Sequence, residues 1–156
     1  MEGINDNMSS SYHTPTHDLI VPETYASIDE SPLRSVTWFQ EHLNLSNRYV
    51  ANVIDVREDV FDNWKSYRYP TPTESQLDDL RAFSTTLTHL LSFLNFRQDL
   101  MMNILESGSE SPQHEPTCLT PPWLGTSLKS YIESQGMRGI EKVDRWVQAL
   151  RWSDPF

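Results

Sequence analysis

The sequence predicts an all-α protein. Apolar residues recur at steps of three and four along several segments, as in helices that bury one face. The clearest example is the stripe Leu77, Leu80, Phe83, Leu87, Leu90, Leu91 and Leu94. Capping residues, prolines and glycines separate these segments, and no segment shows the two-residue alternation typical of a strand.

Capping residues mark the starts of the first helices. Ser31 followed by Pro32 is typical of a helix start, and we expect a helix of about three turns from there. Ser46 is expected to cap a second helix that ends near Ile54. A third helix is expected over 57–66, and the prolines that follow it prevent its continuation.

The second half of the chain predicts a long helix, a linker and a small terminal module. Thr73 is expected to cap the long helix, and a shorter helix after it should end at Gly108. Residues 108–122 are rich in proline and serine, which indicates a linker. Residues 123–156 are expected to form a small helical C-terminal module, so that 31–107 is the main helical domain.

The first 30 residues are predicted to be a flexible acidic tail. The chain has 156 residues and a net charge of −10, and residues 1–32 hold six acids and no Lys or Arg. They are polar and lack periodicity, so they bury too little apolar surface to offset the entropy of ordering. Only the short apolar patch 19–21 offers a group that could dock elsewhere.

Composition indicates a cytoplasmic protein. Cys118 is the only cysteine, so no intramolecular disulfide can form. We expect no membrane span and no secretory leader, because neither type of apolar segment occurs in the sequence. His13 and His17 have a spacing that can bind a metal, but no third ligand lies near them, and we expect neither metal nor cofactor.

The segment 47–66 fits a helix-turn-helix pattern. Ala51 is small where two helices would cross, and Asp55 occupies the turn position that needs a left-handed backbone. The apolar residues of the pattern are Val50, Ile54, Val56, Val60, Phe61 and Trp64. The second helix of such a motif lies in the DNA major groove, so its outward residues are candidates for reading bases.

The outward side chains of this segment are of the types that contact DNA. Arg57 can pair with guanine and Asn63 with adenine, whereas Glu58, Asp59 or Asp62 can accept from cytosine. The remaining candidates, which suit phosphates, are Arg48, Lys65 and Arg68. The alternative is a solvated helix face of mixed charge, since residues 33–70 carry five bases and five acids.

Three tryptophans near the C-terminus are candidates for an interface. Trp123, Trp146 and Trp152 lie within a module that is small for so many large side chains. Tryptophan anchors are common where proteins associate. The alternative is a compact local core.

The order of these parts resembles the Xre/MbcA/ParS-type helix-turn-helix antitoxins. The resemblance rests on Leu45–Trp64, on the long helix after it, and on the C-terminal pattern that begins Trp123-Leu124-Gly125 and includes Gly136. It implies a DNA-binding domain followed by a small helical domain that dimerises and binds a toxin. It also implies that the protein represses its own operon.

These observations favour a DNA-binding transcription regulator of antitoxin type. We expect a homodimer that binds operator double-stranded DNA with two helices one DNA turn apart, with a toxin as protein partner. The alternative is a protein-interaction module whose acidic, degenerate helix-turn-helix does not bind DNA. An enzyme is the least favoured class, because we recognise no nucleophile turn or phosphate-binding loop.

Overall fold

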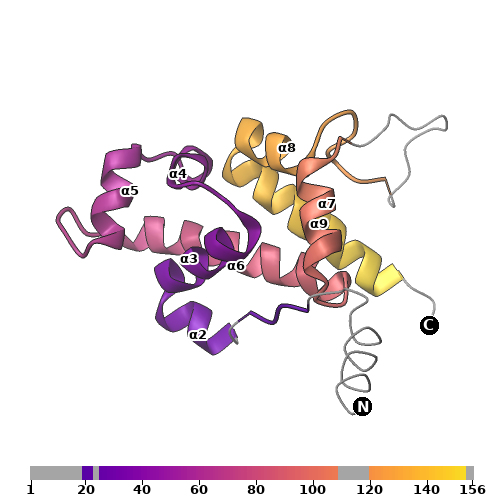
Figure 1. Ribbon diagram of the computed structural model, residues 1–156, viewed down its shortest axis with the longest axis horizontal. Coiled ribbons are helices and arrows are strands. Elements are labelled where there is room, and N and C mark those ends of the chain that lie inside the picture. Colours follow the sequence, from indigo (N-terminus) through magenta and orange to yellow (C-terminus); the bar gives the residue numbers. More distant parts are fainter. Residues whose placement is uncertain (1–18, 23–24, 109–119, 154–156) are drawn as a thin grey trace, which may run out of the picture.

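The computed structural model describes residues 19–22, 25–108 and 120–153 (Figure 1). The side chains of residues 25, 26, 152 and 153 are not described, and His13, His17 and Cys118 lie outside the described residues. Every regular element in the described ranges is a helix, apart from one isolated β-bridge between Leu19 and Arg97. The predicted all-α class is therefore confirmed.

Eight helices make up the described part of the chain. They are α2 (Tyr25–Glu30), α3 (Pro32–Leu43), α4 (Asn47–Ile54), α5 (Glu58–Lys65), α6 (Glu74–Phe93), α7 (Gln98–Glu106), α8 (Leu128–Gln135) and α9 (Met137–Ser153). None of them has the length and apolar composition needed to cross a membrane.

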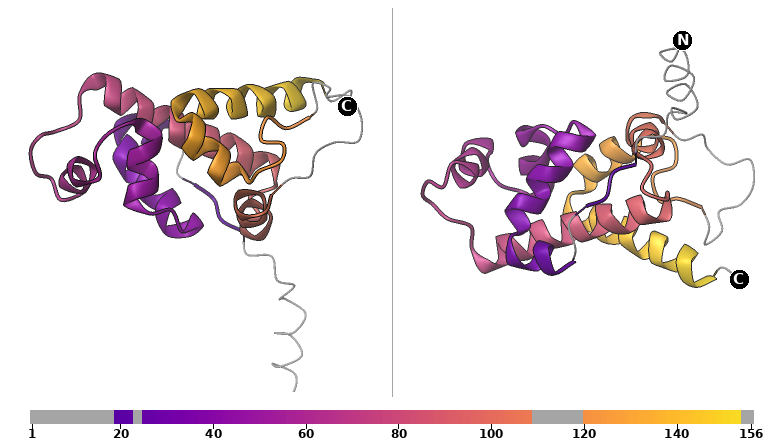
Figure 2. Two further views of the ribbon diagram at one scale, coloured as in Figure 1. Left: turned by 90° about the horizontal axis from the view of Figure 1, so that it is seen from above. Right: turned by 60° about the horizontal axis from the view of Figure 1, so that its bottom comes forward.

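Helix α6 runs through the middle of the molecule. Helices α3 and α9 make the most extensive contacts with it, and α8 fills the space between α4, α7 and α9 (Figure 2). The apolar stripe of α6 supplies Leu80, Phe83, Leu87, Leu90 and Leu91 to the core, each at most 1% exposed. One hydrophobic cluster extends from α3 to α9 and also includes Ile20, so these helices share a single core.

The predicted capping residues begin α4 and α6. The Ser46 hydroxyl accepts a hydrogen bond from the Tyr49 amide at 3.0 Å. Thr73 accepts from the Gln76 amide at 3.2 Å, while the Gln76 side chain accepts from the Thr73 amide at 2.8 Å. These reciprocal bonds satisfy amides that a helix start leaves without intrahelical partners.

The N-terminal segment is more ordered than its composition indicates. Residues 25–30, assigned to the tail from the sequence, form α2, and Ile28 is only 1% exposed. The Ile20 amide donates to the Phe96 carbonyl at 2.9 Å, and the Ile20 side chain is buried. The expected flexible tail therefore does not include these residues, because Ile20, from the apolar patch 19–21, and Ile28 are both buried. Residues 1–18 lie outside the described residues.

The C-terminal helices are not a separate module. Helices α8 and α9 pack against α4, α6 and α7, and Leu128, Ile132 and Val143 belong to the common core. The end of α7 also differs from expectation, because the helix stops at Glu106 and Ser107 is its C-terminal cap. Gly136, with φ of 66° and ψ of −145°, instead ends α8 in a positive-φ conformation that favours glycine, and α9 begins at the next residue.

Candidate nucleic-acid interface

Helices α4 and α5 form a hairpin at one end of the molecule (Figure 1). The turn between them passes through Asp55, whose φ of 60° and ψ of 52° are left-handed, as predicted for this position. The Val56 amide then donates to the Ala51 carbonyl at 2.9 Å. Ala51 is 1% exposed, so its small side chain lies where the chain is closely packed.

Helix α5 is attached to the protein by one face only. Phe61 and Trp64 are its buried residues, at 0% and 2% exposure, and their rings make an edge contact with centroids 6.0 Å apart. Val60 and Lys65 are half-buried. The opposite face of α5 is consequently accessible along its length, which a helix needs if it is to enter a groove of DNA.

The accessible face of α5 is rich in carboxylates. Glu58, Asp59 and Asp62 are exposed, whereas Asn63 is half-buried. The Arg57 side chain is 78% exposed and its Nε lies 3.2 Å from a carboxylate oxygen of Asp59. An ion pair this exposed contributes little to stability. Glu58 and Asp59 also lie in the first turn, where they balance the positive end of the helix dipole.

Lys65 is held by a polar network beneath α5. Its ammonium donates to Gln40 Oε1 at 2.8 Å and to Asn47 Oδ1 at 2.9 Å. Gln40 donates to the same Asn47 oxygen at 2.9 Å, and the Asn47 amide donates to Asp62 at 2.8 Å. The expected phosphate ligand Lys65 therefore joins α3, α4 and α5, which limits its reach toward an external phosphate.

The sequence interpretation missed Gln40 and Asn47 as members of this network. Gln40 is 6% exposed and lies within the apolar stripe of α3, beside Val36, Phe39 and Leu43. A glutamine at such a position needs polar partners, because burial without hydrogen bonds is costly. That pattern is visible in the sequence, but the identity of the partners is not.

The other two expected phosphate ligands are accessible. Arg48 is exposed on α4, and Arg68 is exposed in the loop after α5. The Arg68 amide donates to the Asn63 carbonyl at 2.7 Å, so this loop is tied to the end of α5. Arg68 lies between Tyr67 and Tyr69, which are 95% and 86% exposed.

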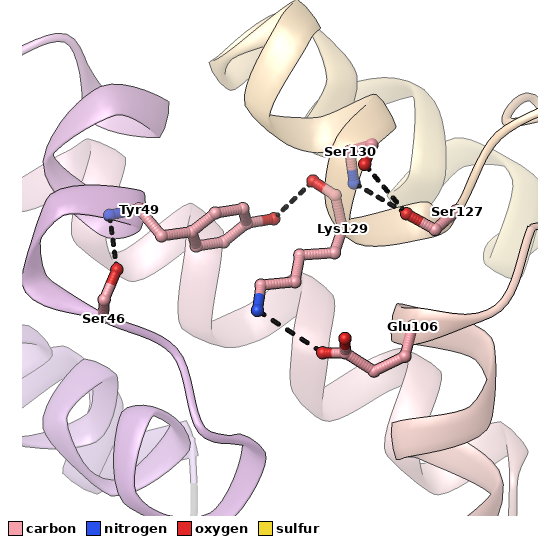
Figure 3. A network of polar contacts seen from close by, with 6 residues as sticks. All are labelled: Ser46, Tyr49, Glu106, Ser127, Lys129 and Ser130. Atoms are coloured by element: carbon pink, nitrogen blue, oxygen red, sulfur yellow. Dashed lines mark hydrogen bonds and ion pairs between the residues drawn. The ribbon is translucent and has the colours of Figure 1, made fainter.

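A second network joins α4 to the C-terminal helices (Figure 3). The buried Tyr49 hydroxyl donates to the Lys129 carbonyl at 2.9 Å. The Lys129 ammonium lies 3.3 Å from a Glu106 oxygen and 5.7 Å from the centre of the Tyr49 ring. Burial, followed by the nearby carboxylates of Glu133 and Glu106, raises the pKa of Tyr49, which remains a neutral donor.

The tryptophans expected at an interface lie in different settings. Trp123 is 5% exposed and meets Trp146 edge-on, with ring centroids 5.0 Å apart. Trp146 is half-buried and also meets Phe93, at 6.2 Å. Trp123 is therefore not exposed as an interface anchor, because neighbouring side chains of the same chain cover its ring. Phe93 is 42% exposed, and the Trp152 side chain lies outside the described residues.

The hairpin thus presents hydrogen-bond donors and acceptors on the accessible face of α5. One polar network links α5 to α3 and α4, and a second links α4 to α7 and α8. In the described ranges, no group of three or more His, Cys, Asp or Glu is arranged to hold a metal ion. No protein-family model matches the chain, and a comparison with curated proteins finds no match either.

Proposed function

We propose that the chain is a sequence-specific DNA-binding transcription regulator, with α5 as the helix that reads DNA. The observation that carries this proposal is the hairpin of α4 and α5, in which Phe61 and Trp64 fix α5 to the core and leave its opposite face accessible. The left-handed turn at Asp55 reverses the chain so that α4 and α5 contact each other. These features support the proposal, because a helix-turn-helix also needs a second helix with one accessible face to enter the major groove.

The candidate DNA-contacting side chains divide into two groups by the contacts they would make. Arg57 and Asn63 would read bases, through paired hydrogen bonds to guanine and adenine respectively. Arg48 and Arg68 would contact phosphates on either side and fix the register of the protein on DNA. Lys65 would contribute indirectly, because its bonds to Gln40 and Asn47 hold α5 in place.

The resemblance to the antitoxin family extends the proposal. It supports a homodimer on a palindromic operator, repression of the protein's own operon, and a toxin as partner. Two copies of α5 would have to lie one DNA turn apart, roughly 34–36 Å. Trp146 and Phe93, whose rings meet in the C-terminal half, are partly accessible and would suit a protein contact.

Selection of bound duplexes from a random-sequence pool tests the proposal without knowledge of the operator. A duplex enriched by the full chain is then titrated with Arg57→Ala and Asn63→Ala, each expected to lose about 1–3 kcal/mol of binding free energy. Lys142→Ala, which removes an exposed base on α9, is the matched control and should bind as the parent does. Equal affinities for all four proteins would refute the role of α5.

The acidic face of α5 favours one alternative, a protein-interaction module that does not bind DNA. Glu58, Asp59 and Asp62 are exposed, and Arg57 is already paired with Asp59. Such a face would repel phosphates and suit a basic protein surface. Replacing Glu58 and Asp62 by Gln and Asn separates the two functions. The change should strengthen DNA binding if α5 enters the groove, and weaken partner binding if the alternative holds.

A further inference from the structure

Two adjoining surface hollows, which share lining residues, form a groove beside α6 and α9 and the ends of α4 and α8. Its larger part has a volume of about 500 Å³ and lies between Ala82 and Thr86 on α6 and Met137 and Ile140 on α9. A second hollow of about 440 Å³ continues toward the end of α4. The two hollows meet at Asp79 and Met137, which line both of them. Each volume lies in the range of pockets that accept ligands.

The walls of this groove carry a strong excess of negative charge. The two hollows are lined by five carboxylates and one base, Arg81. The carboxylates are Asp55, Asp79, Glu133, Glu141 and Asp144. Arg81 already forms an ion pair with Asp78, with an Nη1-to-oxygen distance of 2.7 Å. The floor is apolar, since methionine, isoleucine and alanine line it.

Asp79 holds the central position and has no neutralising cation among the described residues. Burial, followed by the neighbouring Asp78 carboxylate, raises its pKa. Three of the other four carboxylates already have polar partners: His89 Nδ1 lies 2.6 Å from Asp144, Asn52 donates to Glu133, and Glu141 pairs with Arg145. The pair of Glu141 and Arg145 is about 70% exposed on both sides, so water screens it and an incoming cation can replace it.

We propose that this groove, defined by the two hollows that share Asp79 and Met137, docks a cationic, amphipathic segment of another protein. The carboxylates come from α4, α6, α8 and α9 and are spread along the groove, so they match several positive side chains in a row. The apolar floor would receive the aliphatic stems or interleaved apolar residues of that segment. Opposite charges along such a surface favour one partner and repel others.

This inference is independent of DNA binding by α5. The groove lies along α6 and α9, whereas the proposed DNA-reading side chains lie on the accessible face of α5. Asp55, at the end of α4, is the only residue of the turn between α4 and α5 that lines it. Variants of the groove should therefore leave binding of a selected duplex unchanged.

Fluorescence anisotropy with the full chain tests the proposal. The probe is a short labelled peptide of lysine and leucine, and a peptide of glutamate and leucine with the same pattern is its control. The lysine peptide should bind saturably and the glutamate peptide should not. Replacing both Asp79 and Glu141 by the amides should weaken binding about tenfold, because two complementary charges are lost.

Two further variants separate docking in the groove from general attraction to an acidic protein. Replacing Glu58 and Asp59 by their amides removes the same charge from α5 and should leave affinity for the lysine peptide unchanged. Ala82→Trp fills the groove without changing its charge and should abolish binding. Equal losses from both pairs of amide substitutions, or normal binding by Ala82→Trp, would overturn the proposal. Self-association that disappears with Ala82→Trp would overturn it too, by identifying a second copy of the chain as the occupant.

Discussion

Replacing Ile132 by alanine tests whether the C-terminal helices and the α4–α5 hairpin belong to one folding unit. Ile132 is 1% exposed on α8, the helix that contacts α4, α7 and α9. Truncating a buried isoleucine costs about 2–5 kcal/mol, because transfer free energy is lost and a cavity remains. This is a large part of the roughly 5–15 kcal/mol that stabilises a typical domain.

Urea unfolding followed by circular dichroism measures this loss. The midpoint for Ile132→Ala should fall while the slope with denaturant stays the same, because the surface exposed on unfolding is nearly unchanged. Lys142→Ala, an exposed change on α9, is the control and should alter stability by no more than about 0.5 kcal/mol. Hydrogen exchange should show the same decrease in protection for the core amides of α4 and α9.

Two results would rule out a single folding unit closed by Ile132. A loss no larger than that of Lys142→Ala would mean that α8 does not close the core at Ile132. A loss of protection confined to α8 and α9, with α4 and α5 unchanged, would mean that the C-terminal helices fold separately, as the sequence alone indicates.

Three further changes have defined expectations. Tyr49→Phe removes the hydrogen bond to the Lys129 carbonyl and should cost about 0.5–1.5 kcal/mol in chemical unfolding. Thr73→Ala removes the cap of α6 and should cost about 0.5–2 kcal/mol in the same assay. The pKa of Asp79 is raised in the folded protein, so its charged form is disfavoured there. Asp79→Asn should therefore stabilise the protein at neutral pH, and unfolding at a series of pH values should show that gain disappearing as pH falls to the ordinary carboxyl pKa of 3.8.

Local signals in the sequence predict most of the helices. Ser46 and Thr73 cap helices because their hydroxyls reach amides two or three residues ahead, which depends on neighbouring residues alone. Asp55 takes the left-handed turn for a similarly local reason, since a short polar side chain tolerates that conformation. The apolar face of α6 follows directly from its three- and four-residue spacing.

Contacts between distant segments were not predictable in this way. Ile20 and Ile28 lie in a polar segment, and their burial depends on positions supplied by the loop after α6 and by the helices α3 and α6. The proline-rich segment 108–122 indicates a boundary, but composition says nothing about whether the helices after it return to α6. Trp123 illustrates the same limit, because only the arrangement of α6 and α9 reveals the neighbours that bury it.

The sequence predicts which residue types lie at the candidate site, but it does not predict most of the hydrogen bonds that they form. The outward positions of Arg57, Glu58 and Asp62 follow from the placement of Phe61 and Trp64 on the opposite face of α5. Helical spacing does not predict that Lys65 forms hydrogen bonds within the protein. These bonds depend on Gln40 from α3 and Asn47 from α4 meeting beneath α5, which is a property of the folded protein.

Backbone amide NMR of the full chain with a selected duplex tests whether α5 reads DNA. The largest shift changes are expected at Arg57–Lys65 and in the loop that carries Arg68, with smaller changes on α4 near Arg48. The groove between α6 and α9 should be unaffected. Shift changes concentrated on α9, or the absence of any duplex that perturbs α5, would rule out α5 as the DNA-reading helix.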